Sequence, residues 1–227
     1  MVALEELEQK IGYRFHEKGL LRQALTHSSF SNEQKINKWK NYERIEFLGD
    51  AVLELVSSDY FYRTYPEETE GNLTKMRAAA VCEQALAITA RELELGSYMV
   101  FGKGEEHNGG RERDSIIADA VEAIIGAIYL DGGLDQAAAF IRHFVLNDLE
   151  KKRLFYDAKS ILQERVQEEK LGELTYELLR EEGPEHDKVF VMAALLDGKT
   201  IGTGQGKSKK TAQQHAAYDA LLKQKGI

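Results

Sequence analysis

Acidic residues interrupt an apolar helical pattern in residues 41–53, and this feature restricts the fold more than any other. The segment reads Asn41-Tyr42-Glu43-Arg44-Ile45-Glu46-Phe47-Leu48-Gly49-Asp50-Ala51-Val52-Leu53. Glu43, Glu46 and Asp50 are spaced by three and four residues, so at about 100° per residue they share an arc of roughly 60° on one helix face. The apolar residues turn to other sides and are predicted to enter a core: Ile45, Leu48 and Val52.

A second acidic pair, Asp119 and Glu122, lies three residues apart in a segment that is otherwise almost entirely apolar. Residues 115–130 contain no Lys or Arg, and their pattern predicts a buried helix. A carboxylate buried without a partner costs several kcal/mol or takes up a proton. Hard oxygen ligands gathered from two helices suit Mg²⁺ or Mn²⁺. The sequence therefore predicts a divalent-metal site built from both segments.

The competing interpretation is that each acidic set is an ordinary solvated helix face. Acidic residues are mostly exposed in folded proteins, so this reading suits Glu43, Glu46 and Asp50. It suits Asp119 and Glu122 less well, because their neighbours are isoleucines and a solvated slit would have to open between them. A slit of that kind is itself a candidate site.

Length and composition set the remaining limits. The chain has 227 residues, of which 43% are hydrophobic and 30% charged, enough for one or two globular domains. The single cysteine, Cys82, excludes an internal disulfide and fits a reducing compartment. The longest apolar run, residues 123–130, is far short of a membrane span, and the acidic N-terminus does not resemble a secretory signal. We expect a cytoplasmic protein without membrane contact.

The net charge of −8 argues against nucleic acid unless a local basic patch exists. Lys207, Lys209 and Lys210 surround Ser208, a plausible N-cap of a C-terminal helix. Cations at a helix N-terminus oppose the macrodipole, unless an external anion binds there. The lysines therefore indicate a phosphate contact, although an incidental lysine run at a solvated helix end remains the alternative.

Periodicity divides the chain into a helical part and a mixed part. The expected helices of the first part cover residues 4–11, 17–26, 42–60, 72–93, 115–130 and 134–149, and residues 101–111 read as a mobile loop. The later pattern predicts a helix over 161–170, strands over 175–181, 189–196 and 200–203 with a tight turn at 197–199, and a helix over 208–224. We expect an all-α domain over 1–150, a linker over 151–156, and a small α+β domain (α-β-β-β-α) over 157–227.

These patterns resemble a known family in two places. Residues 41–53 resemble the signature segment of ribonuclease III. Residues 157–227 resemble a double-stranded-RNA-binding domain, through Gly206-Lys207-Ser208-Lys209-Lys210-x-Ala212 and Ala216-Ala217. The resemblance spans nearly the whole chain, and it is to the bacterial members of the family.

The resemblance implies roles for the acids. Glu46, Asp119 and Glu122 match metal ligands, and Asp50 and Glu122 match the acids whose loss is most damaging. Glu43 and Glu70 match supporting acids, and Phe47 matches an aromatic residue that contacts a second subunit in a homodimer. The remaining nearby candidate, His27, is better interpreted as a core or hydrogen-bonding residue than as a catalytic one.

The resemblance also implies RNA contacts in the second domain. Gln163, Glu164 and Gln167 match the residues of the first helix that reach a minor groove, and His186 matches a second contact. The residues that match the family's phosphate contact are Lys207, Ser208, Lys209 and Lys210.

The expected function is therefore Mg²⁺-dependent cleavage of double-stranded RNA by activated water, with Mn²⁺ as a possible substitute. The products would carry 5′-phosphate and 3′-hydroxyl ends, and the role would be processing of rRNA or mRNA. Two alternatives stay open. The chain could be a catalytically silent double-stranded-RNA-binding protein on the same scaffold, although every expected carboxylate is present. It could also be a helical metal phosphohydrolase of small phosphates, which the C-terminal module disfavours.

Overall fold

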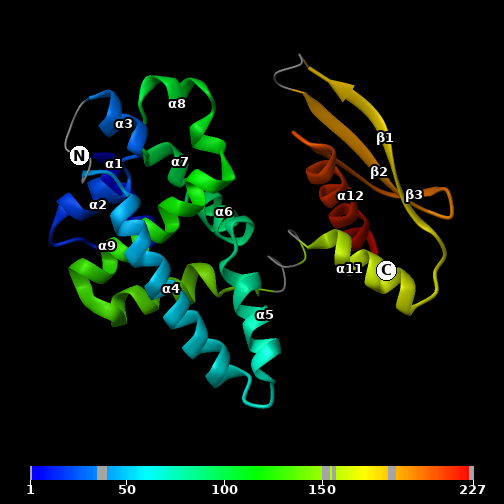
Figure 1. Ribbon diagram of the computed structural model, residues 1–227, viewed down its shortest axis with the longest axis horizontal. Helices are drawn as coiled ribbons and strands as arrows, with labels where there is room; N and C mark the ends of the chain where they lie inside the picture. The colour runs from blue at the N-terminus through cyan, green and yellow to red at the C-terminus, as the bar shows by residue number, and fades with distance from the viewer. Residues whose placement is uncertain (1, 35–39, 150–153, 155–156, 184–187, 225–227) are drawn as a thin grey trace. The chain divides into compact units, whose positions relative to one another are not determined.

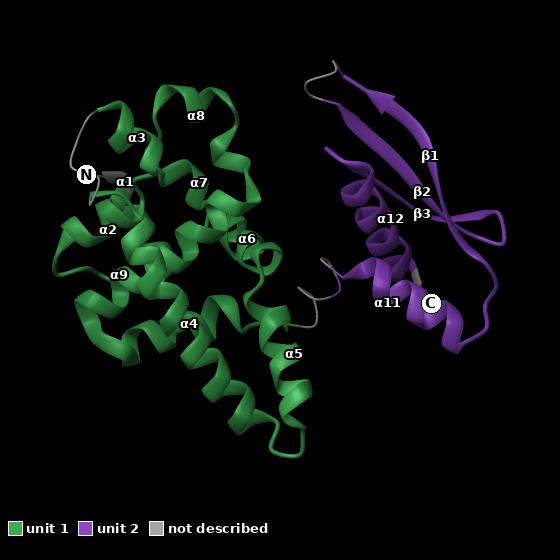
Figure 2. Ribbon diagram, viewed as in Figure 1, with its two compact units in different colours: residues 1–149 green, residues 150–227 purple. Residues whose placement is uncertain are grey.

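The computed structural model describes residues 2–34, 40–149, 154, 157–183 and 188–224 (Figure 1). The chain divides into two compact units, residues 1–149 and 150–227 (Figure 2). The first is helical, and the second combines two helices with a three-stranded antiparallel sheet. The predicted fold class is thus confirmed.

The helices of the first unit are short except for two. They are α1 (Val2–Ile11), α2 (Lys18–Ala24), α3 (Ser28–Glu33), α4 (Glu43–Thr64), α5 (Glu70–Val81), α6 (Glu83–Glu92), α7 (Leu95–Tyr98), α8 (Lys103–His107), the 3₁₀ turn η2 (Gly110–Glu112), α9 (Asp114–Phe140) and the π-helical turn η3 (Ile141–Val145). None of the helices in the described ranges is long and apolar enough to cross a membrane.

Helix α9 forms the centre of the first unit, as its apolar sequence predicts. Ile117, Ile124 and Ile128 are among its fully buried side chains. Helix α4 lies against α9 and contributes Ile45 and Val52 to the same core, whereas Leu48 is only partly buried. Burying these aliphatic side chains supplies roughly 1.5–3 kcal/mol each, so the α4–α9 pair is a major source of stability.

Two glycines let α4 and α9 approach backbone to backbone. A Cβ atom on Gly49 would overlap the carbonyl oxygen of Glu122, and a Cβ atom on Gly126 would overlap the carbonyl oxygen of Ile45. Only glycine fits at these positions without a shift of one helix. The closest approach of the two helices therefore falls beside the predicted acidic residues.

The expected single helix over residues 72–93 was wrong. Cys82 has extended backbone angles (φ −68°, ψ 156°) and separates α5 from α6. Helix α5 packs on α4, whereas α6 packs on α9, so the chain has to change direction between them. Nothing in the local helical pattern marks this change, because tertiary packing imposes it.

The expected loop over residues 101–111 was also wrong, since most of it is helical in α8 and η2. The N-terminus of α8 receives partners from α3, with Lys103 N donating to Glu33 Oε2 (2.6 Å) and Gly102 N to Ser29 Oγ (3.0 Å). Arg111 Nη1 donates to the carbonyl of Met99 (2.9 Å). These contacts join residues far apart in sequence, which a glycine-rich pattern cannot reveal.

The expected break between two helices at residues 131–133 is present as a kink at Gly133 (φ 81°, ψ −177°) inside α9. The helical course is then interrupted after η3 (Ile141–Val145) by a turn at residues 146–148, and Leu149 is helical again. Helix α3, which the sequence pattern did not predict, begins after His27, whose ring accepts a hydrogen bond from Ser29 N (3.2 Å).

The second unit contains α11 (Ala158–Glu168), β1 (Leu174–Glu182), β2 (Val189–Leu196), β3 (Lys199–Gly206) and α12 (Lys209–Gln224), with strand order β1-β2-β3. The predicted hairpin turn is confirmed, because Leu196 pairs with Lys199 and both Asp197 (φ 48°) and Gly198 (φ 76°) have positive φ. Two positive φ angles are what a two-residue type I′ hairpin requires.

Helix α12 packs closely on β3 because small residues face each other. Added Cβ atoms on Gly202 or Gly204 would overlap the backbone at Ala216. Ala212, Ala216 and Ala220 are fully buried. This packing fixes the beginning of α12, where the lysines lie, relative to the sheet.

We predict that Gly49→Ala lowers the free energy of unfolding by about 3 kcal/mol, because the added methyl group forces α4 away from α9. Gly71→Ala is the matched control, since Gly71 is also helical and has open space around its Cβ position. The control should leave stability unchanged or raise it by up to about 1 kcal/mol. Urea unfolding followed by circular dichroism measures both. Equal midpoints for the two variants would contradict the close approach.

Candidate active site

Three carboxylates from two helices meet at the approach of α4 and α9. Glu46 comes from α4, and Asp119 and Glu122 come from α9. One carboxylate oxygen of each lies within 4.8 Å of the others, and all three side chains are partly buried. We refer to Glu46, Asp119 and Glu122 as the acid trio. The structure therefore brings together the three residues predicted as metal ligands.

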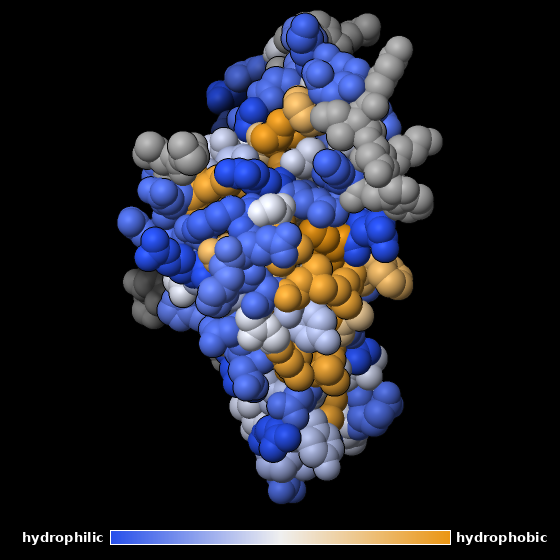
Figure 3. Space-filling model, turned by 90° about the vertical axis from the view of Figure 1, so that its left-hand side faces the viewer, coloured by the Kyte–Doolittle hydropathy of each residue, from blue (hydrophilic) through white to orange (hydrophobic). Residues whose placement is uncertain are grey.

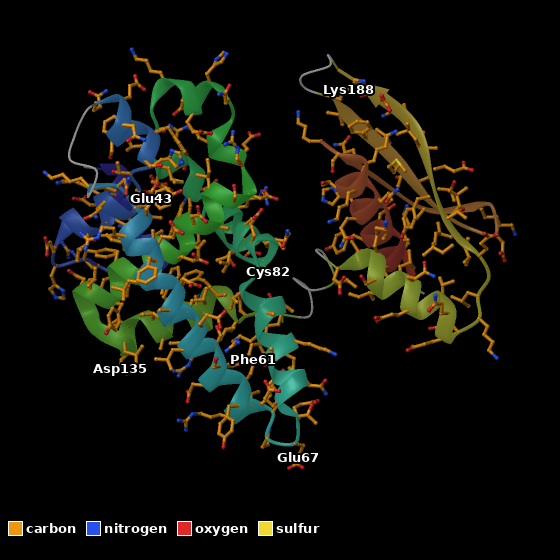
Figure 4. The ribbon with its side chains drawn as sticks, viewed as in Figure 1. Glu43, Phe61, Glu67, Cys82, Asp135 and Lys188 are labelled. Atoms are coloured by element: carbon orange, nitrogen blue, oxygen red, sulfur yellow. The ribbon has the colours of Figure 1, made fainter. Side chains whose placement is uncertain are left out.

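Asp50 and Glu43 lie next to the acid trio on α4. Asp50 is one turn beyond Glu46 and exposed, and its charge raises the pKa of both Glu46 and Glu122. Glu43 is exposed in the first turn of α4, and its backbone N–H donates to Asn41 Oδ1 (3.2 Å). Figure 4 shows Glu43 at the start of α4. Both carboxylates are close enough to Glu46 for their charges to raise its pKa.

The environment of the trio disfavours negative charge. Burial, followed by repulsion from Asp119, Glu43 and Asp50, raises the pKa of Glu46 to about 7. Burial and repulsion from Asp50, Glu46 and Asp119 raise the pKa of Glu122 to about 8. Burial also raises the pKa of Asp119, against a hydrogen bond from Tyr42 that lowers it. Burial is the largest cause of all three shifts.

These observations fit a divalent cation. Among the described residues, no ion pair involves a member of the acid trio. Ligand oxygens lie about 2.1 Å from Mg²⁺, so oxygens on opposite sides of the ion are about 4.2 Å apart. The spacing of the trio needs only small side-chain rotations to reach this distance. An ion bound there would offset the repulsion.

Two further side chains flank Asp119. The Tyr42 hydroxyl donates a hydrogen bond to Asp119 Oδ2 (3.1 Å), and burial raises the pKa of Tyr42 far above its usual value. The ring of His27 lies 5.5 Å from that of Tyr42, between centroids, and burial lowers the pKa of His27. His27 binds Ser29 Oγ through Nδ1 (2.8 Å). The interpretation of His27 as a buried hydrogen-bonding residue is confirmed.

Glu70 and Phe47 lie away from the trio's interior. Glu70 begins α5, near the end of α4 opposite to Glu46, and accepts a hydrogen bond from Thr74 Oγ1 (3.0 Å). Helix α4 is about 33 Å long, and Figure 4 shows Glu43 at its beginning and Glu67 in the turn that follows its other end. The structure does not bring Glu70 to the acid trio. Phe47 is 79% exposed on α4.

The lysines of the second unit gather at the beginning of α12. Ser208 is the N-cap, because its Oγ accepts a hydrogen bond from Thr211 N (3.1 Å). Lys209 and Lys210 are exposed in the first turn. Lys209 Nζ lies 3.6 Å from Glu181 Oε1 of β1, so part of its charge is balanced within the unit. Lys207 is exposed immediately before the N-cap.

Helix α11 carries the other predicted RNA contacts. Gln163, Glu164 and Gln167 are all exposed on it, while Leu162 and Val166 face the core. Their side chains are available to a ligand. His186 lies outside the described residues. Figure 4 shows Lys188 at the beginning of β2, and its ammonium group lies 3.5 Å from Glu181.

The two units match two known sequence profiles. The profile described as ribonuclease-III-like covers residues 17–149, and the double-stranded RNA binding motif covers residues 158–224. The class of the protein is thus a ribonuclease-III-like nuclease domain followed by a double-stranded-RNA-binding domain.

Similar proteins extend this result to the whole chain. Ribonuclease 3 of Pelotomaculum thermopropionicum is 50% identical over 220 residues, covering 96% of this chain and 91% of the relative. Ribonuclease 3 of Caldanaerobacter subterraneus is 50% identical over 223 residues, covering 97% of each. The nuclease domain of Campylobacter jejuni ribonuclease III is 44% identical, with a TM-score of 0.59 over 64% of this chain and 95% of that one. The chain belongs to the ribonuclease III family, and it is an endoribonuclease.

The acidic pattern alone does not single out three residues that shape the site. Gly49 and Gly126 set the helix approach, and Tyr42 contacts Asp119. A glycine inside a helix costs about 1 kcal/mol relative to alanine, so each glycine in these apolar helices is a detectable signal of close packing. Tyr42 carries no comparable signal, because its partner lies 77 residues away.

We predict that without divalent cations the free energy of unfolding falls as the pH rises from about 4.5 to 8. The pKa values of Glu46 and Glu122 are raised to about 7 and 8 from an ordinary value of 4.5. The folded state therefore binds more protons than the unfolded state in this range, and stability decreases as the pH rises through these values. Thermal melts at several pH values measure the effect.

Glu122→Gln removes one ionisation and should flatten this dependence, whereas Glu67→Gln at an exposed turn should not. Comparing the two variants distinguishes the contribution of the acid trio to this pH dependence from that of the other carboxylates. The same pH dependence in Glu122→Gln and in the unmodified protein would show that repulsion in the trio does not affect stability.

Proposed function

We propose that this endoribonuclease cleaves double-stranded RNA at the acid trio in a reaction that requires Mg²⁺, for which Mn²⁺ can substitute. The observation that carries the proposal is the meeting of the partly buried Glu46, Asp119 and Glu122 within 4.8 Å. The double-stranded-RNA-binding domain in the same chain supplies the matching substrate class.

Each residue of the site has a distinct task in this proposal. Glu46, Asp119 and Glu122 hold the cation, and Asp50 stands exposed beside them, where it can accept a hydrogen bond from the attacking water. Glu43 adds negative charge at the same opening and is a supporting acid. Glu70 remains a weaker candidate, because it lies at the other end of α4.

Bound Mg²⁺ would supply the positive charge that activates water and offsets charge developing on the leaving oxygen. The products are then 5′-phosphate and 3′-hydroxyl ends, because water attacks phosphorus and the 3′ oxygen leaves. The partly buried position of the trio limits competing solvent and strengthens these electrostatic effects.

Recognition would depend on the shape and backbone of an A-form duplex rather than on its base sequence. Gln163, Glu164 and Gln167 are exposed on one helix and would reach a minor groove. Lys207, Lys209 and Lys210, with the N-terminal end of α12, would bind phosphates. His186 is proposed as a contact from the sequence resemblance alone.

We also propose a homodimer formed through the α4 face. Phe47 is 79% exposed and Leu55 57% exposed on α4, although large apolar side chains are usually buried. Figure 3 shows apolar side chains gathered in a band on one face of the molecule. A solved structure of the Campylobacter jejuni nuclease domain, 44% identical, concerns structural flexibility in a region involved in dimer formation. Phe47 is our candidate dimer contact.

On the same basis we propose the domain limits: residues 1–150 form the catalytic domain, 151–156 the linker and 157–227 the RNA-binding domain. The linker, apart from Leu154, lies outside the described residues. A cytoplasmic location and a role in processing rRNA or mRNA suit an enzyme of this class. The silent-binder alternative is disfavoured, because every expected carboxylate is present and the relatives named above are ribonucleases.

We predict that Glu122→Gln lowers the cleavage rate of a duplex RNA more than about 100-fold. Loss of outer partners of metal ligands already costs 10–100-fold, so loss of a ligand should cost more. RNA affinity should stay unchanged, because the second unit is intact. Cleavage of an end-labelled duplex with and without Mg²⁺ measures rate and end chemistry, and a gel-shift assay in Ca²⁺ measures affinity.

Glu67→Gln is the matched control and should cleave at the normal rate. If the unmodified protein binds the duplex but never cleaves it with Mg²⁺, the nuclease proposal fails. Full-rate cleavage by Glu122→Gln would remove Glu122 from the site while leaving the activity itself in place.

We predict that Lys209→Ala with Lys210→Ala weakens duplex binding and makes the plot of log affinity against log salt shallower by about 2. Each lost phosphate contact reduces the slope by about 1. Lys199→Ala with Lys223→Ala is the matched control, because it removes the same charge from the hairpin turn and the far end of α12. Equal slopes in both double variants would show that the lysines act only through net charge.

A further inference from the structure

Tyr42 lies next to the acid trio, and the proposed chemistry does not use it. It directly precedes α4 and is only 4% exposed. Its hydroxyl donates to Asp119 Oδ2 across 3.1 Å. The side chain of Tyr42, at the beginning of α4, thus reaches a proposed metal ligand on α9.

The backbone holds Tyr42 firmly on both sides. Its N–H donates to the carbonyl of Thr26 (2.9 Å). Its own carbonyl accepts from Ile45 N (2.8 Å) and Glu46 N (2.9 Å), which ties it to the turn that carries Glu46. The ring also packs against His27, with 5.5 Å between centroids. The position of the hydroxyl is therefore fixed relative to Glu46.

The hydrogen bond has a direction that suits a metal ligand. A tyrosine hydroxyl is protonated at neutral pH and can donate its proton to a carboxylate. Donation to Oδ2 restricts rotation of the Asp119 carboxyl group, while Oδ1 remains available to a cation. Metal-ligating side chains are commonly oriented by such outer partners.

We infer that Tyr42 is a positioning residue, which holds the Asp119 carboxylate in the orientation that the divalent cation requires. This inference rests on the proposed metal site at the acid trio. Tyr42 does not touch the reacting atoms and acts only through Asp119.

The chain contains a matched tyrosine that makes the same type of bond elsewhere. Tyr13 donates its hydroxyl to Asp131 Oδ2 across 2.7 Å, and the Asp131 side chain is 2% exposed. Asp131 also accepts from the backbone N–H of Glu17 (2.8 Å), so this pair fixes the beginning of α2. Asp131 lies 12 residues beyond Asp119 on α9, about 18 Å along the helix. Removing the Tyr13 hydroxyl therefore shows the effect of losing a similar hydrogen bond that lies away from the acid trio.

The test compares Tyr42→Phe with Tyr13→Phe in the full chain. Mn²⁺ binding is measured directly by electron paramagnetic resonance, and thermal melts record stability. We expect Tyr42→Phe to weaken Mn²⁺ binding about 10-fold and to shift the Mg²⁺ dependence of cleavage to higher concentration. Duplex affinity should stay unchanged. Tyr13→Phe should bind Mn²⁺ normally, even where its melting temperature falls.

A double-mutant cycle keeps the result independent of folding effects. In an Asp119→Asn background, Tyr42→Phe should cause no further loss of Mn²⁺ affinity, because the carboxylate that the hydroxyl orients is gone. If Glu122→Gln weakens Mn²⁺ binding but Tyr42→Phe does not, the positioning role is overturned and the metal site stands. If Glu122→Gln binds Mn²⁺ as the unmodified protein does, the metal site itself fails, and the inference fails with it.

Discussion

The backbone contact between α4 and α9 is the constraint on which the rest of the first unit depends. Gly49 faces Glu122, and Gly126 faces Ile45, so neither helix can move away without opening the core. The same contact places Glu46 beside Asp119 and Glu122. Packing and chemistry therefore share one interface, and the free energy of burying the isoleucines of α9 offsets the cost of gathering three carboxylates.

Much of this arrangement could be predicted from the sequence because it follows from periodicity. The spacing of Glu43, Glu46 and Asp50 identifies one face of α4, and the acids within apolar residues 115–130 identify α9 as the partner helix. The break at Cys82, the fold of α8 and the contact from Tyr42 to Asp119 could not be predicted. Each depends on residues distant in sequence, where local pattern carries no information.

The second unit shows how a protein with net charge −8 can present positive charge locally. Small residues on β3 and α12 pack the helix tightly on the sheet, which fixes the lysines around Ser208 relative to the sheet. Glu181 is close to both Lys188 and Lys209 and balances part of this charge. The basic cluster is therefore local and partly neutralised, so net charge alone is a poor guide to its presence.

The glycine contact also limits how the acid trio can change during evolution. Exchanging one carboxylate alters a single ligand, whereas replacing Gly49 or Gly126 moves α4 relative to α9 and changes every distance across the helix pair at once. Cation selectivity depends on cavity size and on how rigidly the ligands are held. Two residues without side chains thus set the range of ionic radii that the carboxylates can accommodate.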